Sequence, residues 1–123
     1  MSTTTVPAPG TNLSILVGEL SRDVELRTLP SGDEVLGLEL TVRPPDGPAE
    51  SVPLAWPSPP AAAMRWQAGE QLVVTGRVRR RFFRAAGATQ SRTEVVVTSA
   101  VPTRRGATVR RALDAALAAA SLE

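Results

Sequence analysis

The sequence contains no cysteine, no histidine and no tyrosine, and its only aromatic residues are two tryptophans and two phenylalanines. Without cysteine the chain forms no disulfide and carries no thiol nucleophile. Without histidine it lacks the side chain most often used for acid–base catalysis and a usual ligand of zinc. We therefore expect no enzyme activity, no metal site and no cofactor.

Long apolar runs are also missing, since none approaches the roughly 20 residues that a membrane helix requires. The segment Met1–Gly10 is rich in Ser, Thr and Pro and lacks the basic-then-apolar order of a secretory signal. We expect a cytoplasmic protein that does not contact membranes. A length of 123 residues fits one domain with a small core.

Lysine is absent as well, so all fourteen basic residues are arginine, and the formal net charge is only +2. A GC-rich coding bias accounts for the missing lysine, but not for the position of the arginines. Five of them lie between Arg77 and Arg84, whereas acidic residues dominate residues 19–50. The planar guanidinium group suits two-pronged contacts with phosphate and stacks on bases.

The arginine cluster lies in a predicted β-hairpin. Two strand patterns, Gln71–Phe83 and Arg92–Val101, flank a short polar connection that contains Gly87. Alternation along the first strand places Val78, Arg80 and Phe82 on one face and Arg77, Arg79, Arg81 and Phe83 on the other. A charge run is often only a solvated surface, but a second adjacent phenylalanine favours a face that holds a nucleic-acid backbone and a stacked base.

The remaining patterns predict an all-β protein, a five-stranded OB-fold barrel with a short helix between strands 3 and 4 and a C-terminal helix. Alternating leucines in Glu34–Val42 predict a half-buried strand, and Gly76 indicates a bend or a close backbone approach. The other predicted elements are a strand over Leu13–Leu20 and Val24–Leu29 kinked near Ser21-Arg22, a strand over Ser51–Trp56, and helices over Ala61–Gln67 and Thr108–Ala120. The residues expected in the core are Leu36, Leu38, Leu40, Leu72, Val74 and Val96.

Four segments follow from these patterns. Residues 1–11 are predicted to be a flexible N-terminal arm, 12–102 the OB-fold domain, and 103–121 a helical extension. The final pair, Leu122-Glu123, is typical of a tag remnant and is left out of the functional reasoning.

Five sequence motifs occur in the order and spacing of a known family. They are Asn12–Leu20, Asp23–Thr28 followed by Pro30-Ser31-Gly32, Val52–Trp56, Ala68–Val78, and Thr93–Val96. Together they span roughly Asn12 to Val101, and over this range the chain resembles the bacterial single-stranded DNA-binding protein family. The resemblance implies an OB-fold and non-catalytic, sequence-non-specific binding of single-stranded DNA.

The resemblance also implies roles for individual residues. Trp56 and Phe83 match base-stacking positions, and Arg79 and Arg81 match positions that contact phosphate. The hairpin sequence adds Arg77 and Arg84, with Arg43 and Arg92 as flanking contacts.

Two of the family's aromatic positions have no aromatic residue in this sequence. They fall near Glu50 or Ser51 and within the short loop Arg43–Ala49. Trp66 is expected to pack at the barrel end, and Phe82 to lie in the core or in an interface. Fewer stacking rings predict weak, strongly salt-dependent binding.

The family's long tail with an acidic tip has no counterpart here, so we interpret the chain as a divergent, truncated paralogue. The resemblance implies a homo-oligomer, dimer or tetramer, and replication or repair proteins as further partners. The alternative is an OB-fold protein-interaction module of replication or repair complexes with weak or lost DNA binding.

Overall fold

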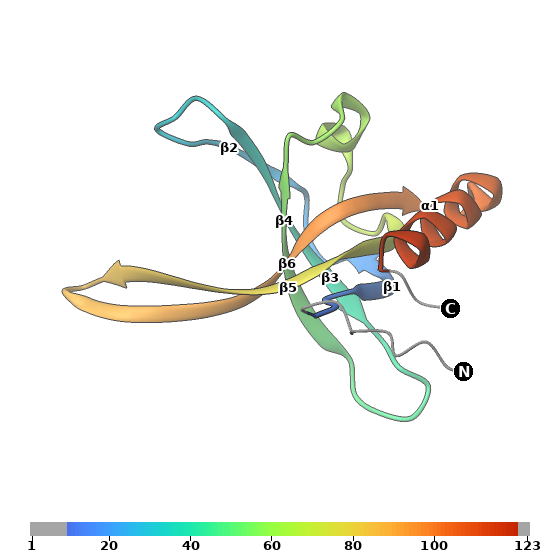
Figure 1. Cartoon of the computed structure of the whole chain (residues 1–123), viewed down its shortest axis with the longest axis horizontal. Helices are drawn as coiled ribbons and strands as arrows, with labels where there is room; N and C mark the ends of the chain where they lie inside the picture. The colour runs from blue at the N-terminus through green and yellow to red at the C-terminus, as the bar shows by residue number, and fades with distance from the viewer. Residues whose placement is uncertain (1–9, 121–123) are drawn as a thin grey trace, which may run out of the picture.

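The computed structural model describes residues 10–120, which fold mainly into β-strands (Figure 1). The interpretations of the N-terminal arm and of Leu122-Glu123 lie wholly or mostly outside these residues. The strands are β1 (Ser14–Leu20), β2 (Glu25–Thr28), β3 (Glu34–Val42), β4 (Glu50–Pro57), β5 (Gln71–Ala85) and β6 (Ala88–Pro102). A 3-10 helix, η1 (Ala61–Arg65), precedes β5, and one α-helix, α1 (Gly106–Ala119), follows β6. Within residues 10–120 no helix has the length and apolar character needed to cross a membrane.

Five of the strands form a closed ring. The sheet order is β1-β5-β6-β4-β3-β2. Because β1 also pairs with β3, the strands β1, β5, β6, β4 and β3 close into a ring. All pairings are antiparallel except the one between β4 and β6, which is parallel at Leu54 and Ala55. The predicted kink near Ser21-Arg22 is confirmed, because the chain leaves the ring after Leu20 and β2 pairs only with the end of β3 nearest its turn.

The core fills this ring as the leucine pattern predicts. Leu36, Leu38 and Leu40 are buried on the inward face of β3. The other three residues expected in the core, Leu72, Val74 and Val96, are also buried. The alternation of β3 therefore fixed its register, since a shift by one residue would turn every leucine outward.

Two glycines allow backbones to approach at the ring's bends. A Cβ at Gly18 would overlap the carbonyl oxygen of Thr41 on β3, and a Cβ at Gly76 would overlap that of Val96 on β6. The β5–β6 register shifts between Thr75 and Gly76, which marks a bulge. The interpretation of Gly76 as a close backbone approach is confirmed.

The predicted C-terminal helix is confirmed as α1, and the largest changes from the predicted bounds concern the helix before β5 and the hairpin strands. The helix predicted over Ala61–Gln67 is a 3-10 helix that ends at Arg65, because Trp66 adopts an extended backbone and its ring packs 6.0 Å from that of Trp56. The hairpin strands are longer than predicted. They are joined by a two-residue turn in which Ala86 and Gly87 both have positive φ, a geometry that lets antiparallel strands pair up to the turn.

The β1–β3 contact that closes the ring is reinforced by one serine. The Ser21 amide donates to the Glu39 carbonyl oxygen over 3.0 Å, and the Ser21 hydroxyl donates to Glu39 Oε1 over 2.9 Å. The hydroxyl bond holds the pKa of Glu39 below its ordinary value of 4.5. A carboxyl group whose pKa is lower in the folded state stabilises the fold at pH values above its ordinary pKa. That contribution is lost as the pH falls through the lowered pKa.

We therefore predict that Ser21→Ala lowers the free energy of unfolding at pH 7 by less than about 1 kcal/mol, the scale of exposed polar interactions. The difference from wild type should shrink as the pH falls below 4.5, since protonated Glu39 no longer gains from the bond. Urea unfolding at several pH values measures this. In a Glu39→Gln background the effect of Ser21→Ala should not depend on pH; a pH dependence that persists there would contradict the assignment.

Candidate nucleic-acid interface

The outer halves of β5 and β6 project from the ring as a two-stranded finger, defined here as residues 79–94 (Figure 1). β1 pairs with β5 only as far as Gly76, and β4 pairs with β6 only at Val95 and Val96. Beyond these points the two strands pair only with each other, from Arg79 with Glu94 to Ala85 with Ala88. Both edges of the finger are thus free of neighbouring strands.

The two faces carry different side chains, as the alternation predicts. The inner face, on the side of β4, holds Arg79, Arg81 and Phe83, all half-buried. The outer face holds Arg80, Phe82 and Arg84, all exposed. Arginine and phenylalanine therefore occur together on both faces.

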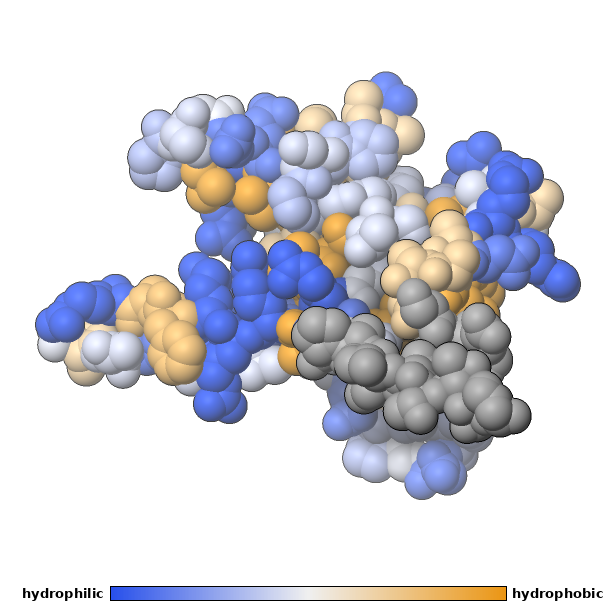
Figure 2. Space-filling view, in the orientation of Figure 1, coloured by the Kyte–Doolittle hydropathy of each residue, from blue (hydrophilic) through white to orange (hydrophobic). Residues whose placement is uncertain are grey.

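A groove separates the inner face from the hairpin that β2 and β3 form. Figure 2 shows this hollow between two projections, with hydrophilic residues covering the finger side. We call it the inner groove; its lining residues are Arg27, Leu29, Val35, Ala55, Pro57, Arg79, Arg81 and Glu94. It adjoins a second depression that shares Arg27, Ala55 and Glu94 and adds the arginines Arg22 and Arg92 and the carboxylates Asp23 and Glu25. The combined surface has an apolar floor, and its walls carry more guanidinium groups than carboxylates.

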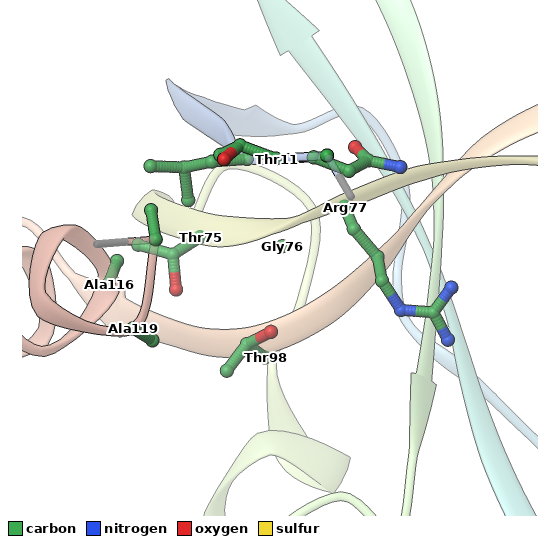
Figure 3. Close-up of a pocket in the computed structure, with 11 residues that line it drawn as sticks. Thr11, Thr75, Gly76, Arg77, Thr98, Ala116 and Ala119 are labelled. Carbon is green, nitrogen blue, oxygen red and sulfur yellow. The ribbon is translucent and has the colours of Figure 1, made fainter. Parts of the chain in front are cut away.

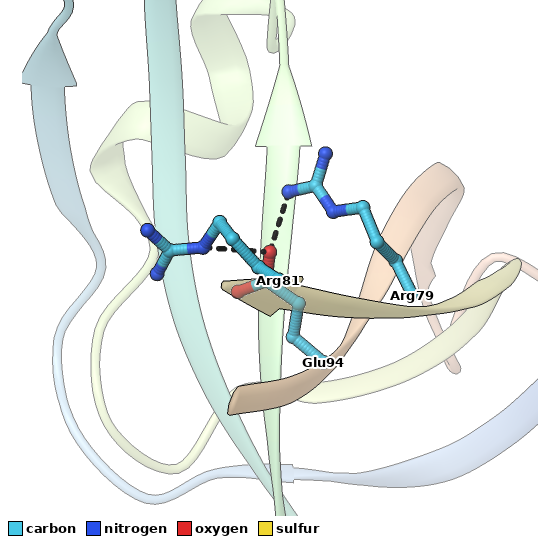
Figure 4. A network of polar contacts seen from close by, with 3 residues as sticks. All are labelled: Arg79, Arg81 and Glu94. Atoms are coloured by element: carbon cyan, nitrogen blue, oxygen red, sulfur yellow. Dashed lines mark hydrogen bonds and ion pairs between the residues drawn. The ribbon is translucent and has the colours of Figure 1, made fainter. Parts of the chain in front are cut away.

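Glu94 holds the two arginines of the inner face together (Figure 4). Its Oε2 lies 2.5 Å from an Nη of Arg79 and 3.5 Å from Nε of Arg81. The Glu94 side chain is only 6% exposed, against 39% and 40% for the arginines. Arg81 in turn lies over the Phe83 ring, with its guanidinium carbon 5.3 Å from the ring centroid. The Glu94 carboxylate thus holds the guanidinium groups of Arg79 and Arg81 in position. Through Arg81 it also keeps one face of the Phe83 ring covered.

This network is only partly neutralised. Two guanidinium groups and one carboxylate leave a net charge of +1, and each guanidinium has five N–H donors, of which Glu94 can satisfy few. Within residues 10–120, Nε of Arg79 is buried with no hydrogen-bond partner. The cluster therefore keeps guanidinium donors that Glu94 does not satisfy, but an anion bound there would also meet the field of the carboxylate.

The other predicted contacts divide between separate places. Arg92 lines the depression that adjoins the inner groove, whereas Arg84 lies on the outer face and donates to the Gly87 carbonyl oxygen over 3.2 Å. Arg77 borders a different pocket between the N-terminal segment and α1, and its side chain extends away from the helix (Figure 3). Arg43 borders a third depression beside β1. The structure therefore does not bring Arg77 or Arg43 into the inner groove.

Two aromatic residues differ from their predicted environments. Trp56, predicted to stack a base, is 7% exposed and belongs to the core, where it packs against Trp66. Alternation along β4 places Trp56 on the same inward face as Val52 and Leu54, so the strand pattern predicts burial where the family resemblance predicts a stacking position. Phe82, predicted to lie in the core or an interface, is 66% exposed. The core prediction is wrong because the finger extends past the body that would have covered this ring.

Arg22, Arg27 and Glu94 were missed as site residues. Arg27 and Glu94 lie in the motifs that carry the family resemblance, but nothing local in the sequence shows that they face the same groove. Their meeting depends on the β2–β3 and β5–β6 pairings, which are non-local. Comparison of the chain with models of protein families and with curated proteins finds no match.

We predict that Glu94→Gln strengthens binding of oligo-dT at low salt. The amide has the size of the carboxylate but removes its charge, so the net charge of the cluster rises from +1 to +2. The dependence of log affinity on log salt should steepen by about 0.7, the value for one single-strand phosphate contact.

Fluorescence anisotropy of a labelled oligonucleotide measures both quantities. Glu70→Gln is the matched control, because it breaks an ion pair with Arg104 that lies outside the inner groove. Equal or weaker binding by a folded Glu94→Gln protein would show that Glu94 does not oppose the ligand.

Proposed function

We propose that this protein binds single-stranded DNA without sequence specificity and catalyses no reaction. The observation that carries this proposal is the inner groove, in which Arg27, Arg79 and Arg81 border an apolar floor of Val35, Ala55 and Pro57. Guanidinium groups beside apolar and aromatic surface suit a chain of phosphates and flat bases. Base stacking and phosphate contacts tolerate any base sequence, which favours binding without sequence preference.

The strand ring supports an OB-fold barrel. If β1 and β2 are taken as one bent strand, the chain has five strands in the order of that fold, with η1 between the third and the fourth. OB-folds bind oligonucleotides on the face of the second and third strands and on the loops between strands 1 and 2 and between strands 4 and 5. In this chain those parts are β3, β4, the turn near Leu29 and the finger, which are the elements that border the inner groove.

We assign each groove residue a simple task. Arg79 and Arg81 bind phosphates, and Arg27 and Arg92 extend the basic path across the floor. Phe83 offers a stacking surface on the side of its ring that Arg81 does not cover, and the Arg81 guanidinium can itself continue the stack. With one ring beside the groove and none in its lining, phosphate contacts supply most of the affinity, so binding is weak and salt-dependent.

The second candidate function is a protein-interaction module that has kept the strand ring and lost the nucleic acid. The burial of Trp56 and the carboxylate of Glu94 inside the basic groove favour it. The number of arginines around the groove favours the first candidate. The two differ in whether the wild-type protein retains an oligonucleotide at all.

We predict that Arg79→Ala and Arg81→Ala each weaken oligonucleotide binding regardless of base sequence and each lower the salt slope by about 0.7. Phe83→Ala should cost about 1–3 kcal/mol with little change of slope, because stacking releases no counterions. Anisotropy titrations at several salt concentrations measure the affinity and the salt slope. The oligonucleotide should have about 30 bases, which exceeds the largest site size expected for one OB-fold.

Arg43→Ala is the matched control, since Arg43 is exposed but borders another depression, and it should leave binding almost unchanged. Loss of retention by the wild-type protein itself at low salt would remove the DNA-binding proposal. The protein-interaction module would then be the better description.

We further propose that the protein forms a homo-oligomer, a dimer or a tetramer, through β1. One edge of β1 pairs with β5, but the other pairs with β3 only at Glu19 and Leu20. Along this strand Ile15 and Val17 are 43% and 57% exposed. An apolar strand with an open edge promotes aggregation unless another chain covers it.

We predict a mass of at least twice 13.0 kDa by light scattering at micromolar concentration. Val17→Arg should shift the protein towards monomer, because it places a charge in the apolar strand face. Leu26→Arg, a control on the exposed strand β2, should not. A monomeric wild-type protein would overturn the oligomer proposal.

A further inference from the structure

The outer face of the finger has the composition of a binding surface that the inner groove does not use. Phe82 has the greatest exposure, 66%, among the large hydrophobic residues of the described chain, and it lies between Arg80 and Arg84 on the same strand face. The residues paired across the finger, Thr93, Ser91 and Thr89, all carry hydroxyl groups. One planar ring is thus placed between two guanidinium groups and beside a row of neutral polar side chains.

The charges of this face are uncompensated, unlike those of the inner face. The ion pairs within residues 10–120 join Arg79 and Arg81 to Glu94 and Arg104 to Glu70, so neither Arg80 nor Arg84 pairs with a carboxylate there. Arg84 is held at the finger tip by its bond to the Gly87 carbonyl oxygen. The strand rise places Arg80 and Arg84 about 13 Å apart, with the ring midway between them.

The exposed ring of Phe82 adds little to the stability of the finger. A two-stranded ribbon is only marginally stable in water, and an exposed phenylalanine contributes little to it. The cross-strand partner of Phe82 is Ser91, which gives the ring no apolar neighbour across the ladder. A ligand that covers the ring is the interaction that would stabilise this arrangement.

We propose that the outer face is a second contact surface for the same single-stranded nucleic acid, with a base stacked on Phe82 and phosphates bound by Arg80 and Arg84. This inference rests on the proposed function, since the nucleic-acid chain would reach the outer face by crossing the finger from the inner groove. Phe82 and Phe83 are adjacent residues on opposite faces, so one strand that passes over the finger can stack on both rings.

Charge and area favour nucleic acid over an acidic protein as the occupant. A protein interface of ordinary size buries about 800 Å² on each partner around an apolar centre. The outer face offers one ring flanked by arginines and hydroxyl groups, which is too little apolar surface for such a centre. A single base needs only the ring, and its neighbouring phosphates need only the two guanidinium groups.

The test compares the two faces with oligo-dT of two lengths, about 6 and about 30 nucleotides, chosen near the bottom of and above the 4–16 nucleotides expected for one OB-fold. Phe82→Ala should weaken binding of the long oligonucleotide about 5- to 150-fold and leave the short one, which fills the inner groove, nearly unchanged. The pair Arg80→Gln and Arg84→Gln should lower the salt slope for the long oligonucleotide by about 1.4. Phe83→Ala is the matched control on the inner face and should weaken binding of both lengths.

A direct signal comes from Phe82→Trp. Its fluorescence should be quenched by the long oligonucleotide, whereas wild-type protein, whose two tryptophans pack against each other at the core, should respond much less. Quenching together with the loss of long-oligonucleotide affinity in Phe82→Ala supports the inference.

The failures of the two proposals are distinguishable. If Phe83→Ala weakens binding while Phe82→Ala matches wild type at both lengths, the inner groove stands and the outer face is excluded as a contact surface. If the Phe82→Trp signal responds to a peptide of alternating glutamate and phenylalanine and not to oligo-dT, the outer face is a protein site and the inference is wrong. If wild-type protein binds neither oligonucleotide at low salt, the proposed function fails, and this inference fails with it.

Discussion

The antiparallel pairing of β5 with β6 is the constraint on which the rest of the molecule depends. Its inner half supplies Leu72 and Val74 to the core and links β1 to β4 through the ring. Its outer half leaves the ring as the finger, which carries the arginines and both phenylalanines. One ladder therefore joins the core to the candidate site, and the bulge between Thr75 and Gly76 sets the bend between its two halves.

Residues whose environment depends on local pattern could be predicted from the sequence, and those that depend on non-local pairing could not. The leucines of β3 and the two faces of the finger followed from alternation with a period of two. The Arg79–Glu94–Arg81 cluster required the β5–β6 register, which the Ala86-Gly87 turn sets. The prediction for Trp56 is wrong because the resemblance outweighed the alternation of β4. For Phe82 only the core alternative is wrong, because no local signal tells how far a hairpin extends beyond its core.

Glu94 makes the two faces of the finger differ in the extent to which their positive charge is compensated. On the inner face its nearly buried carboxylate aligns Arg79 and Arg81 but offsets part of their charge. Burying such a carboxylate is costly unless it is paired, so the arginines also stabilise Glu94 in place. On the outer face Arg80 and Arg84 have no carboxylate partner in the described chain and keep their full charge, but they lack the walls of a groove. The inner face thus has the better-fixed arginines, and the outer face has the less compensated positive charge.

This division has a consequence for how a polyanion would meet the protein. Long-range attraction depends on uncompensated charge, which is greatest on the exposed outer face and falls off over about 8–10 Å at ordinary salt. Tight fixing of a phosphate depends on donors already held in position, which the inner face provides through Glu94. A ribbon that is marginally stable alone gains from contact on both sides. For the binding proposed above, the finger would combine a surface suited to capture with one suited to retention, and the pairing of β5 with β6 holds the two on opposite faces of one ribbon.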